Sequence, residues 1–224
     1  MIDNGRLRRI SEECVYSHGR YNIGTYRERS QHLVLKKYFE ENAELHEVPV
    51  GGYIADIKKG NDITEIQTSG FASMRDKLGA FLKDFSTTIV YPVAQRKWVS
   101  WIEPESGEIT ARNPAPRKGR FTDVIPEMIC IRQFLLHPNL TVRVVLLEID
   151  EYRMLNAQRS RSRKRGSTRY ERVPLNICGI YDFRETQDYI DLLPFAQDAV
   201  FTAQDVAGAL KLRGRRISAG MRVL

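Results

Sequence analysis

Apolar and polar positions follow two different periods along this chain, and each period predicts its own kind of element. Residues 22–150 combine short alternating or continuously apolar runs, typical of strands, with segments whose apolar residues recur every three or four positions, typical of helices. Because these helices and strands follow one another, the pattern predicts an α/β fold with a mixed β-sheet flanked by helices. The C-terminal part, residues 176–224, is expected to be a small, mainly helical module.

The same pattern assigns approximate bounds to the elements. Helices are expected over 24–41, 71–85 and 122–136, and strands over 87–94, 97–103 and 141–149. The helix over 71–85 has a predicted buried face made of Phe71, Met74, Leu78, Phe81, Leu82 and Phe85. The strand over 141–149 is the most hydrophobic, so we expect it to be central. Residues 1–21 are polar and basic, and this N-terminal arm could be a short helix or a loose segment.

Residues 52–68 predict a β-hairpin that carries two acids. If its polar turn spans 59–62, Asp56 on the first strand falls opposite Glu65 on the second. Opposed side chains have Cβ atoms about 5 Å apart, and two carboxylates at that distance repel unless a positive charge lies between them. Carboxylate oxygens suit Mg²⁺ or Mn²⁺, so the pair predicts a divalent-metal site. Gln67 lies on the same face of its strand as Glu65.

The helix expected over 24–41 could bring a third acid to this site. Glu28 shares one face with His32, Leu35 and Phe39, because the four residues follow helical spacing. If Leu35 and Phe39 pack on the hairpin, Glu28 approaches the carboxylate pair. The ordinary alternative for a helical glutamate is a solvated ion pair with a neighbouring basic residue.

The order of these residues resembles the PD-(D/E)XK nuclease superfamily, particularly its resolvase-like and restriction-endonuclease-like members. Glu28 on a helix precedes Asp56 on a strand and Glu65-x-Gln67 on the next strand, and a further helix follows. The resemblance covers about residues 22–150. It implies a restriction-endonuclease-like fold in which Asp56 and Glu65 hold the metal and Glu28 supports it.

Gln67 departs from the pattern of that superfamily. The position usually holds a lysine, which positions or activates the attacking water. A glutamine can orient water but has no positive charge, so catalysis would depend on the metal to lower the pKa of the water. Lys77 or Arg75, on the following helix, could supply the missing charge. The departure also leaves open a catalytically inactive protein that only binds DNA or regulates.

Residues 151–175 form a predicted basic linker or loop. Seven of the fourteen residues from 159 to 172 are basic and almost none is apolar, so the segment cannot bury itself. We expect it to contact the phosphate backbone of nucleic acid, and the plain alternative is a charged surface loop. The candidate contacts are Arg159, Arg161, Arg163, Lys164 and Arg165.

The C-terminal module carries a helix-start signal. Thr202 and Asp205 match a capping box, and a second helix is expected from about residue 217. The arrangement resembles a helix-turn-helix of the winged-helix type, in which the second helix enters the major groove. The DNA contacts would then come from Arg213, Arg215, Arg216 and Arg222. Helix-turn-helix units also dock proteins, so a protein partner stays open.

Composition agrees with an anionic partner. The net charge is +7 and the isoelectric point is about 9.4, which favours nucleic acid as the commonest polyanion. The three cysteines are far apart and have no metal-ligand spacing, which indicates reduced thiols in a cytoplasmic protein. No signal peptide and no apolar run of about 18 residues is present, so no membrane association is expected.

Together these features predict a metal-dependent DNA phosphodiesterase, an endonuclease-like hydrolase that binds DNA through its basic C-terminal part. The alternatives are a catalytically inactive, nuclease-like DNA-binding or regulatory protein, and an interaction protein that docks an acidic partner. An endonuclease of this type often needs two copies to cut both strands, so a homodimer is conceivable.

Overall fold

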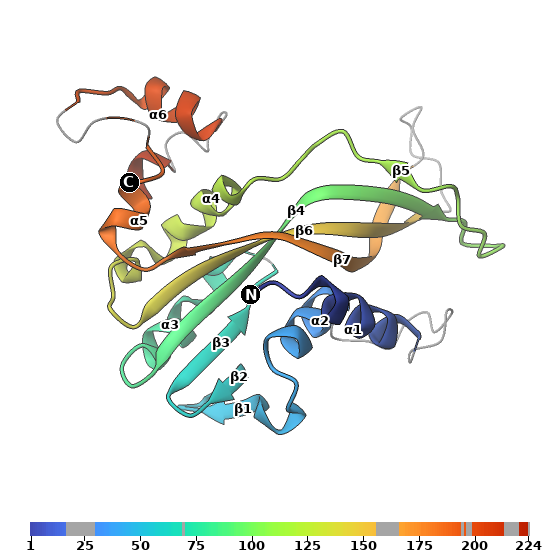
Figure 1. The fold of residues 1–224 in the computed structure, drawn as a ribbon, viewed down its shortest axis with the longest axis horizontal. Coiled ribbons are helices and arrows are strands. Elements are labelled where there is room, and N and C mark those ends of the chain that lie inside the picture. Colours follow the sequence, from blue (N-terminus) through green and yellow to red (C-terminus); the bar gives the residue numbers. More distant parts are fainter. Residues whose placement is uncertain are drawn as a thin grey trace. The chain divides into compact units, whose positions relative to one another are not determined.

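The computed structural model describes residues 1–16, 30–68, 70–155, 166–193, 195, 199–212 and 220–223. Within these ranges, seven strands form one sheet that contains both parallel and antiparallel neighbours, and helices flank it (Figure 1). The C-terminal part is helical. The predicted fold class, an α/β protein with a mixed sheet and a mainly helical C-terminal part, is therefore confirmed.

The elements have the following bounds. The α-helices are α1 (Asn4–Tyr16), α2 (Ser30–Phe39), α3 (Arg75–Phe81), α4 (Ile125–Met128), α5 (Thr186–Ile190) and α6 (Ala203–Leu210). Short 3-10 segments are η1 (Ala43–Leu45), η2 (Phe71–Met74), η3 (Phe121–Val124) and η4 (Ile129–Phe134). The strands are β1 (His46–Val50), β2 (Tyr53–Lys59), β3 (Asp62–Ile66), β4 (Ser86–Ile102), β5 (Asn113–Pro114), β6 (Leu140–Leu155) and β7 (Ser167–Phe183).

The strands follow the order β1-β2-β3-β4-β6-β7, and β5 pairs with β4. As expected for the most hydrophobic strand, β6 lies inside this order, between β4 and β7. The chain divides into two compact units that are not continuous in sequence. The first contains residues 1–41, 94–119 and 146–179, and the second contains residues 42–93, 120–145 and 180–224. The strands β4, β6 and β7 contribute residues to both units.

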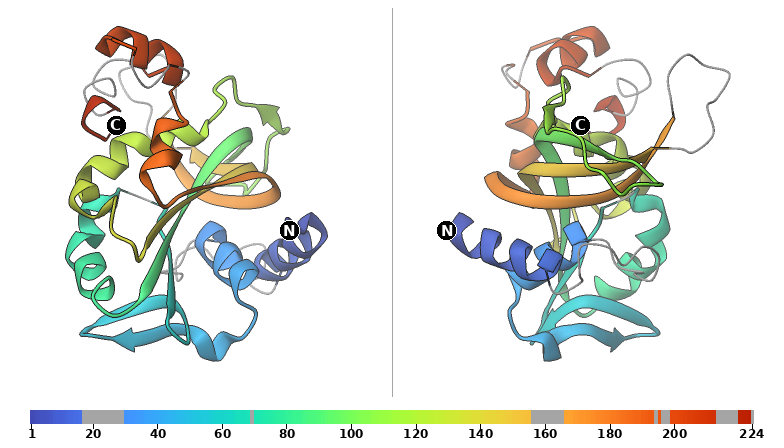
Figure 2. Two further views of the ribbon diagram at one scale, coloured as in Figure 1. Left: turned by 60° about the vertical axis from the view of Figure 1, so that its left-hand side comes forward. Right: turned by 90° about the vertical axis from the view of Figure 1, so that its right-hand side faces the viewer.

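In the first unit, α1 packs against α2 and is hydrogen-bonded to β7 (Figure 2). The side chain of Asn4 donates to the carbonyl of Ile177 at 3.2 Å and accepts from its backbone N–H at 2.7 Å. Ser11 Oγ donates to the carbonyl of Pro174 at 2.7 Å. Leu7 and Ile10 are buried beneath these contacts. The N-terminal arm, whose conformation the sequence left open, is therefore a helix over residues 4–16.

The buried face of α2 differs from the expected one. The sequence placed Leu35 and Phe39 together on the packing face, but the fully buried apolar residues are Val34 and Leu35, and Phe39 is only half-buried. Tyr38 is also buried, and its hydroxyl accepts the backbone N–H of Asp3 at 3.0 Å. Tyr38 contacts the residue just before α1, so a tertiary contact helps to decide which residues of this mixed helix are covered.

The second unit contains the predicted hairpin with the predicted register. Strands β2 and β3 pair Ile57 with Thr64, Lys58 with Ile63 and Lys59 with Asp62. The turn between them has Gly60 at φ +59°, a backbone conformation that glycine adopts without a steric penalty. Beyond this hairpin, β3 pairs in parallel with β4, from Asp62 opposite Ser86 to Ile66 opposite Val90.

The connection between β3 and β4 covers the hairpin with an apolar helix face. The helix predicted over 71–85 begins as η2 and continues as α3, which ends at Phe81. Its expected face is buried at Phe71, Met74, Leu78, Phe81 and Leu82, but Phe85 is only half-buried. Phe81 packs with Ala55 of β2 and Ile63 of β3. Each such fully buried large apolar side chain contributes about 1.5–3 kcal/mol, so this contact anchors α3 to the hairpin.

Three segments are arranged differently from the sequence expectation. The strands predicted over 87–94 and 97–103 form one continuous strand, β4. The C-terminal half of β4 pairs with β5 at Trp98 and Val99. The helix predicted over 122–136 is divided into η3, α4 and η4, and Ile131 inside η4 has non-helical angles (φ −122°, ψ 19°). Of the predicted linker over 151–175, residues 151–155 belong to β6 and residues 167–175 belong to β7.

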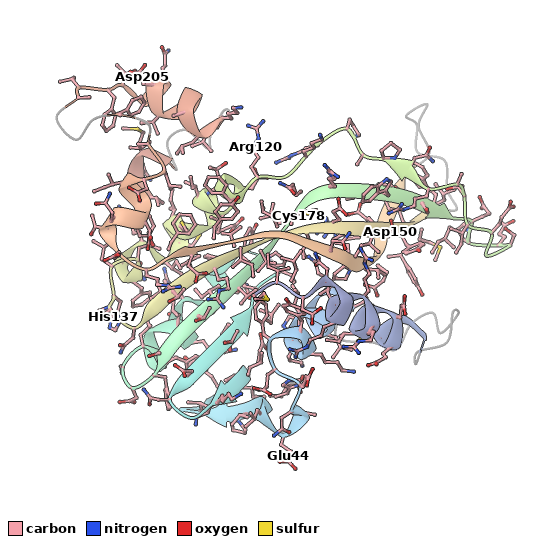
Figure 3. All side chains as sticks on the ribbon, viewed as in Figure 1. Glu44, Arg120, His137, Asp150, Cys178 and Asp205 are labelled. Carbon is pink, nitrogen blue, oxygen red and sulfur yellow. The ribbon has the colours of Figure 1, made fainter. Side chains whose placement is uncertain are left out.

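The C-terminal part of the second unit confirms the predicted capping box. Thr202 N donates to Asp205 Oδ2 at 2.7 Å and Asp205 N donates to Thr202 Oγ1 at 3.3 Å, at the start of α6 (Figure 3). Val206 and Leu210 of α6 pack with Ile125 of α4. Residues 213–219 lie outside the described residues, so the helix-turn-helix stays a prediction.

None of the helices in the described ranges is long and apolar enough to cross a membrane. Cys14, Cys130 and Cys178 form no disulfide within the described ranges; Cys14 is buried and Cys178 is exposed.

Candidate metal and catalytic site

The hairpin brings Asp56 and Glu65 together in the second unit. The pairing of β2 with β3 runs as far as Ile57 and Thr64, and beyond this point the two carboxylates accept the backbone N–H groups of the opposite strand. Glu65 Oε1 accepts from Asp56 N at 3.0 Å, and Asp56 Oδ2 accepts from Ile66 N at 2.7 Å. Buried backbone donors need such partners, so both acids also complete the end of the hairpin.

A lysine from the next helix completes this arrangement. Lys77 Nζ on α3 donates to Glu65 Oε2 at 2.5 Å, and its side chain is only 20% exposed. Its ammonium also lies 5.5 Å from the ring centroid of Phe81. Arg75, the other candidate for a substitute charge, forms an ion pair with Asp76 at 3.8 Å and is largely exposed. Of the two candidates, the structure brings Lys77 to the acids.

The carboxyl of Glu65 has a strongly shifted pKa. Glu65 is 4% exposed, and its burial together with the charge of Asp56 raises its pKa to about 7, although the hydrogen bond and charge of Lys77 lower it. A divalent cation could bind the carboxylate of such a residue in place of the proton that it holds near neutral pH. Shifted carboxyls of this kind are enriched at functional sites.

Gln67 directly follows β3, and its backbone and side-chain amides donate to backbone carbonyls outside the carboxylate pair. Its backbone N–H donates to the carbonyl of Val90 at 2.9 Å. Its side-chain amide donates to the carbonyl of Gly70 at 2.9 Å. In this position the amide anchors the start of the connection to α3.

The donors present fit a hard divalent cation in part. Mg²⁺ is commonly held by one or two carboxylates and keeps several waters, and Asp56 and Glu65 supply two carboxylates on adjacent strands. No group of three histidine, cysteine, aspartate or glutamate side chains suited to a metal occurs in the part of the chain that the structure describes. Glu28, the expected third acid, lies outside that part.

The predicted nucleic-acid contacts are mostly outside the described residues. This holds for Arg159, Arg161, Arg163, Lys164 and Arg165 and for Arg213, Arg215 and Arg216. Arg222 is described: it is exposed and lines a cavity of about 480 Å³ in the second unit, together with Arg132 and Tyr189.

Sequence reasoning missed one charged cluster, which surrounds Glu151 on β6. The signal for it was an acid in a strand whose other residues are mostly apolar, because a buried acid requires partners. The partners come from β4 and β7 as well as from β6, so sequence spacing could not identify them.

The fold and site define an α/β protein with two adjacent acids on a hairpin, of which Glu65 is buried and Asp56 is half-buried, and with a lysine from the following helix. Residues 29–184 match the family described as a domain of unknown function, DUF8091, and the chain belongs to this family. The matched range contains the hairpin, α3 and the Glu151 cluster. The chain is also 27% identical, over 186 residues, to an uncharacterized protein of Treponema pallidum (strain Nichols). That alignment covers 83% of this chain and 73% of the relative. No solved structure matches the chain.

Proposed function

We propose that this protein is a metal-dependent DNA phosphodiesterase in which Asp56 and Glu65 hold Mg²⁺ or Mn²⁺. The observation that carries the proposal is the junction of Asp56, Glu65 and Lys77 within one strand–strand–helix unit. Two adjacent carboxylates of which one is buried are costly for a fold, and their presence beside a lysine favours a chemical role. Asp56 on β2 and Glu65 on β3 also precede α3 in the order expected from the resemblance to the PD-(D/E)XK superfamily.

The chain's own residues divide the work as follows. Asp56 and Glu65 would hold the ion, which when bound would lower the pKa of an attacking water and stabilise charge on the leaving oxygen. Lys77 has the positive charge that Gln67 lacks, so we assign to Lys77 the role of orienting the water and the scissile phosphate. Gln67 keeps the loop after β3 in place through its bond to Gly70.

A second function is favoured by the same ion pair. Lys77 already neutralises Glu65 without a metal, as it would in a site that serves only to hold the hairpin on α3. The protein would then be a catalytically inactive DNA-binding or regulatory protein. The two functions differ in whether the acids take up a metal.

Calorimetric titration of Mn²⁺ into the wild type and into Asp56→Asn/Glu65→Gln tests the proposal. A matched control is Asp62→Asn/Glu44→Gln, which removes two exposed acids from the same unit. We expect the wild type and the control to bind Mn²⁺ and to nick a supercoiled plasmid, and the site variant to do neither. Metal uptake that survives in the site variant would contradict the assignment. Absence of Mn²⁺ uptake by the wild type would favour the inactive protein.

A further inference from the structure

Four basic side chains in the first unit surround one buried acid. Glu151 of β6 is 1% exposed. Its Oε2 lies 2.9 Å from Arg172 Nε, 3.2 Å from Lys97 Nζ and 3.7 Å from Arg169 Nε. Its Oε1 lies 3.4 Å from Arg153 Nη1. The cations come from three neighbouring strands, β4, β6 and β7, and we call these five residues the Glu151 cluster.

The cluster has more positive charge than its own acid can balance. Burial alone would raise the pKa of Glu151, but Arg172 and Lys97 outweigh it and lower the pKa, so the acid is ionised. Glu171 lies next to Arg172 in the sequence, and its Oε1 accepts the backbone N–H groups of Arg172 and Ser30. Four cations share this one carboxylate, and like charges held close together repel one another, so the cluster is suited to a further anion.

The basic groups are positioned to meet a ligand. Glu151 is buried, but the side chains of Arg169 and Arg153 are 43% and 35% exposed, so they reach from the acid to the surface. Lys97 and Arg172 are exposed to a smaller extent. Tyr170, beside Arg169 on β7, is an exposed aromatic residue. Exposed cations gathered on one part of a sheet are typical of surfaces that contact nucleic acid.

The cluster also adjoins the most basic part of the sequence. β6 ends at Leu155 and β7 begins at Ser167, so the chain between these strands carries Arg159, Arg161, Arg163, Lys164 and Arg165. Arg153 precedes this segment and Arg169 follows it. Strands β6 and β7 therefore hold fixed cations at both ends of a run of further cations.

We propose that the Glu151 cluster binds the phosphate backbone of duplex DNA, with Glu151 as the positioning residue that holds the cations. The proposal rests on the proposed function, for which it names the surface that contacts the substrate. Duplex DNA is favoured because its closely spaced phosphates can engage several cations of a rigid sheet at once. An anionic lipid surface or an acidic protein would need contacts of a different kind and is an outcome of the test.

Fluorescence anisotropy with a labelled DNA duplex, in EDTA, compares wild type with Arg169→Gln/Arg172→Gln. The matched control is Arg96→Gln/Arg184→Gln, which removes the same charge from two exposed arginines whose partners are Glu148 and Asp182. We expect the cluster variant to bind DNA about tenfold more weakly than the wild type. The slope of its log affinity against log salt concentration should fall by the equivalent of about two phosphate contacts, while the affinity of the control stays within about twofold of the wild type. Arg169→Lys/Arg172→Lys should recover most of the affinity if charge is the cause.

Several results would overturn the proposal. Equal losses in the cluster variant and the control would mean that only net charge matters. The proposal would also be overturned if the wild type bound no duplex. It would likewise be overturned if phosphatidylserine vesicles bound in a cluster-dependent way and DNA did not. The near-ultraviolet circular dichroism of each variant confirms that it is folded. Because EDTA removes divalent metal, the DNA affinity measured in this experiment is independent of whether Asp56 and Glu65 take up Mn²⁺.

Discussion

Lys77 Nζ of α3 lies 2.5 Å from Glu65 Oε2 of β3, and this ion pair connects the hairpin to the helix that covers it. The register of the hairpin decides where Glu65 lies, and the packing of Phe81 against Ala55 and Ile63 decides where α3 lies. Together they leave one ammonium beside two acids. The charge balance of this site is therefore sensitive to the removal of any one of the three side chains.

Removal of Lys77 should raise the pKa of Glu65 further. Lys77 lowers that pKa by its charge and its hydrogen bond, while burial and Asp56 act in the opposite direction. In Lys77→Met we expect Glu65 to titrate above about 7, as measured by carboxyl NMR, and plasmid nicking to fall at least a hundredfold. Lys83→Met, which changes an exposed lysine just after α3, should leave both unchanged. An unmoved titration in Lys77→Met would contradict the ion pair.

The stability of the protein should depend on the protonation of Glu65. Its pKa is raised from 4.5 to about 7 on folding, so the folded state holds the proton more tightly than the unfolded state. The resulting stability is fully present below about pH 4.5 and is lost as the pH rises to about 7, by roughly 3 kcal/mol. Urea unfolding at intervals over this range should show the loss in the wild type and not in Glu65→Gln. A pH dependence that is the same in both proteins would count against the shift.

Neutralisation of Glu151 should destabilise the first unit. The Glu151→Gln substitution leaves four neighbouring cations without their shared counter-charge, and breaking a buried ion network costs about 3–5 kcal/mol. Inorganic phosphate should restore part of the loss, because it supplies the missing negative charge. The comparison is Glu148→Gln, which removes a carboxylate of the same strand that contacts Arg96 and Asn176. Urea unfolding with and without phosphate measures both effects, and an equal cost in the two variants would argue against the cluster.

The capping box of α6 should stabilise this helix locally. Thr202 and Asp205 exchange hydrogen bonds at the helix start, so Thr202→Ala should cost about 1 kcal/mol. Hydrogen exchange at the amides of Val206 and Ala207 should become faster by about fivefold, which corresponds to that cost. Gln204→Ala changes an exposed residue of the same helix and should leave exchange unaffected. Unchanged exchange in Thr202→Ala would show that the cap contributes nothing.

The sequence by itself determined the elements whose causes are local. The polar turn predicted over 59–62 is tighter in the structure, where Lys59 still pairs with Asp62, but both turns give the same register, which brings Asp56 and Glu65 together. The apolar stripe over 71–85 repeats at helical spacing, so the buried face of η2 and α3 follows from the order of residues. The capping box at Thr202 is equally local. These features depend on neighbours within a few positions, which a sequence displays directly.

Only the tertiary structure decided which distant side chains meet. Lys77 and Arg75 are two residues apart, but the direction of each side chain from α3 brings only Lys77 to Glu65. Glu151 gathers cations from β4 and β7 because strand pairing brings residues far apart in sequence side by side. Such contacts depend on packing between elements, and no local pattern of residues specifies it.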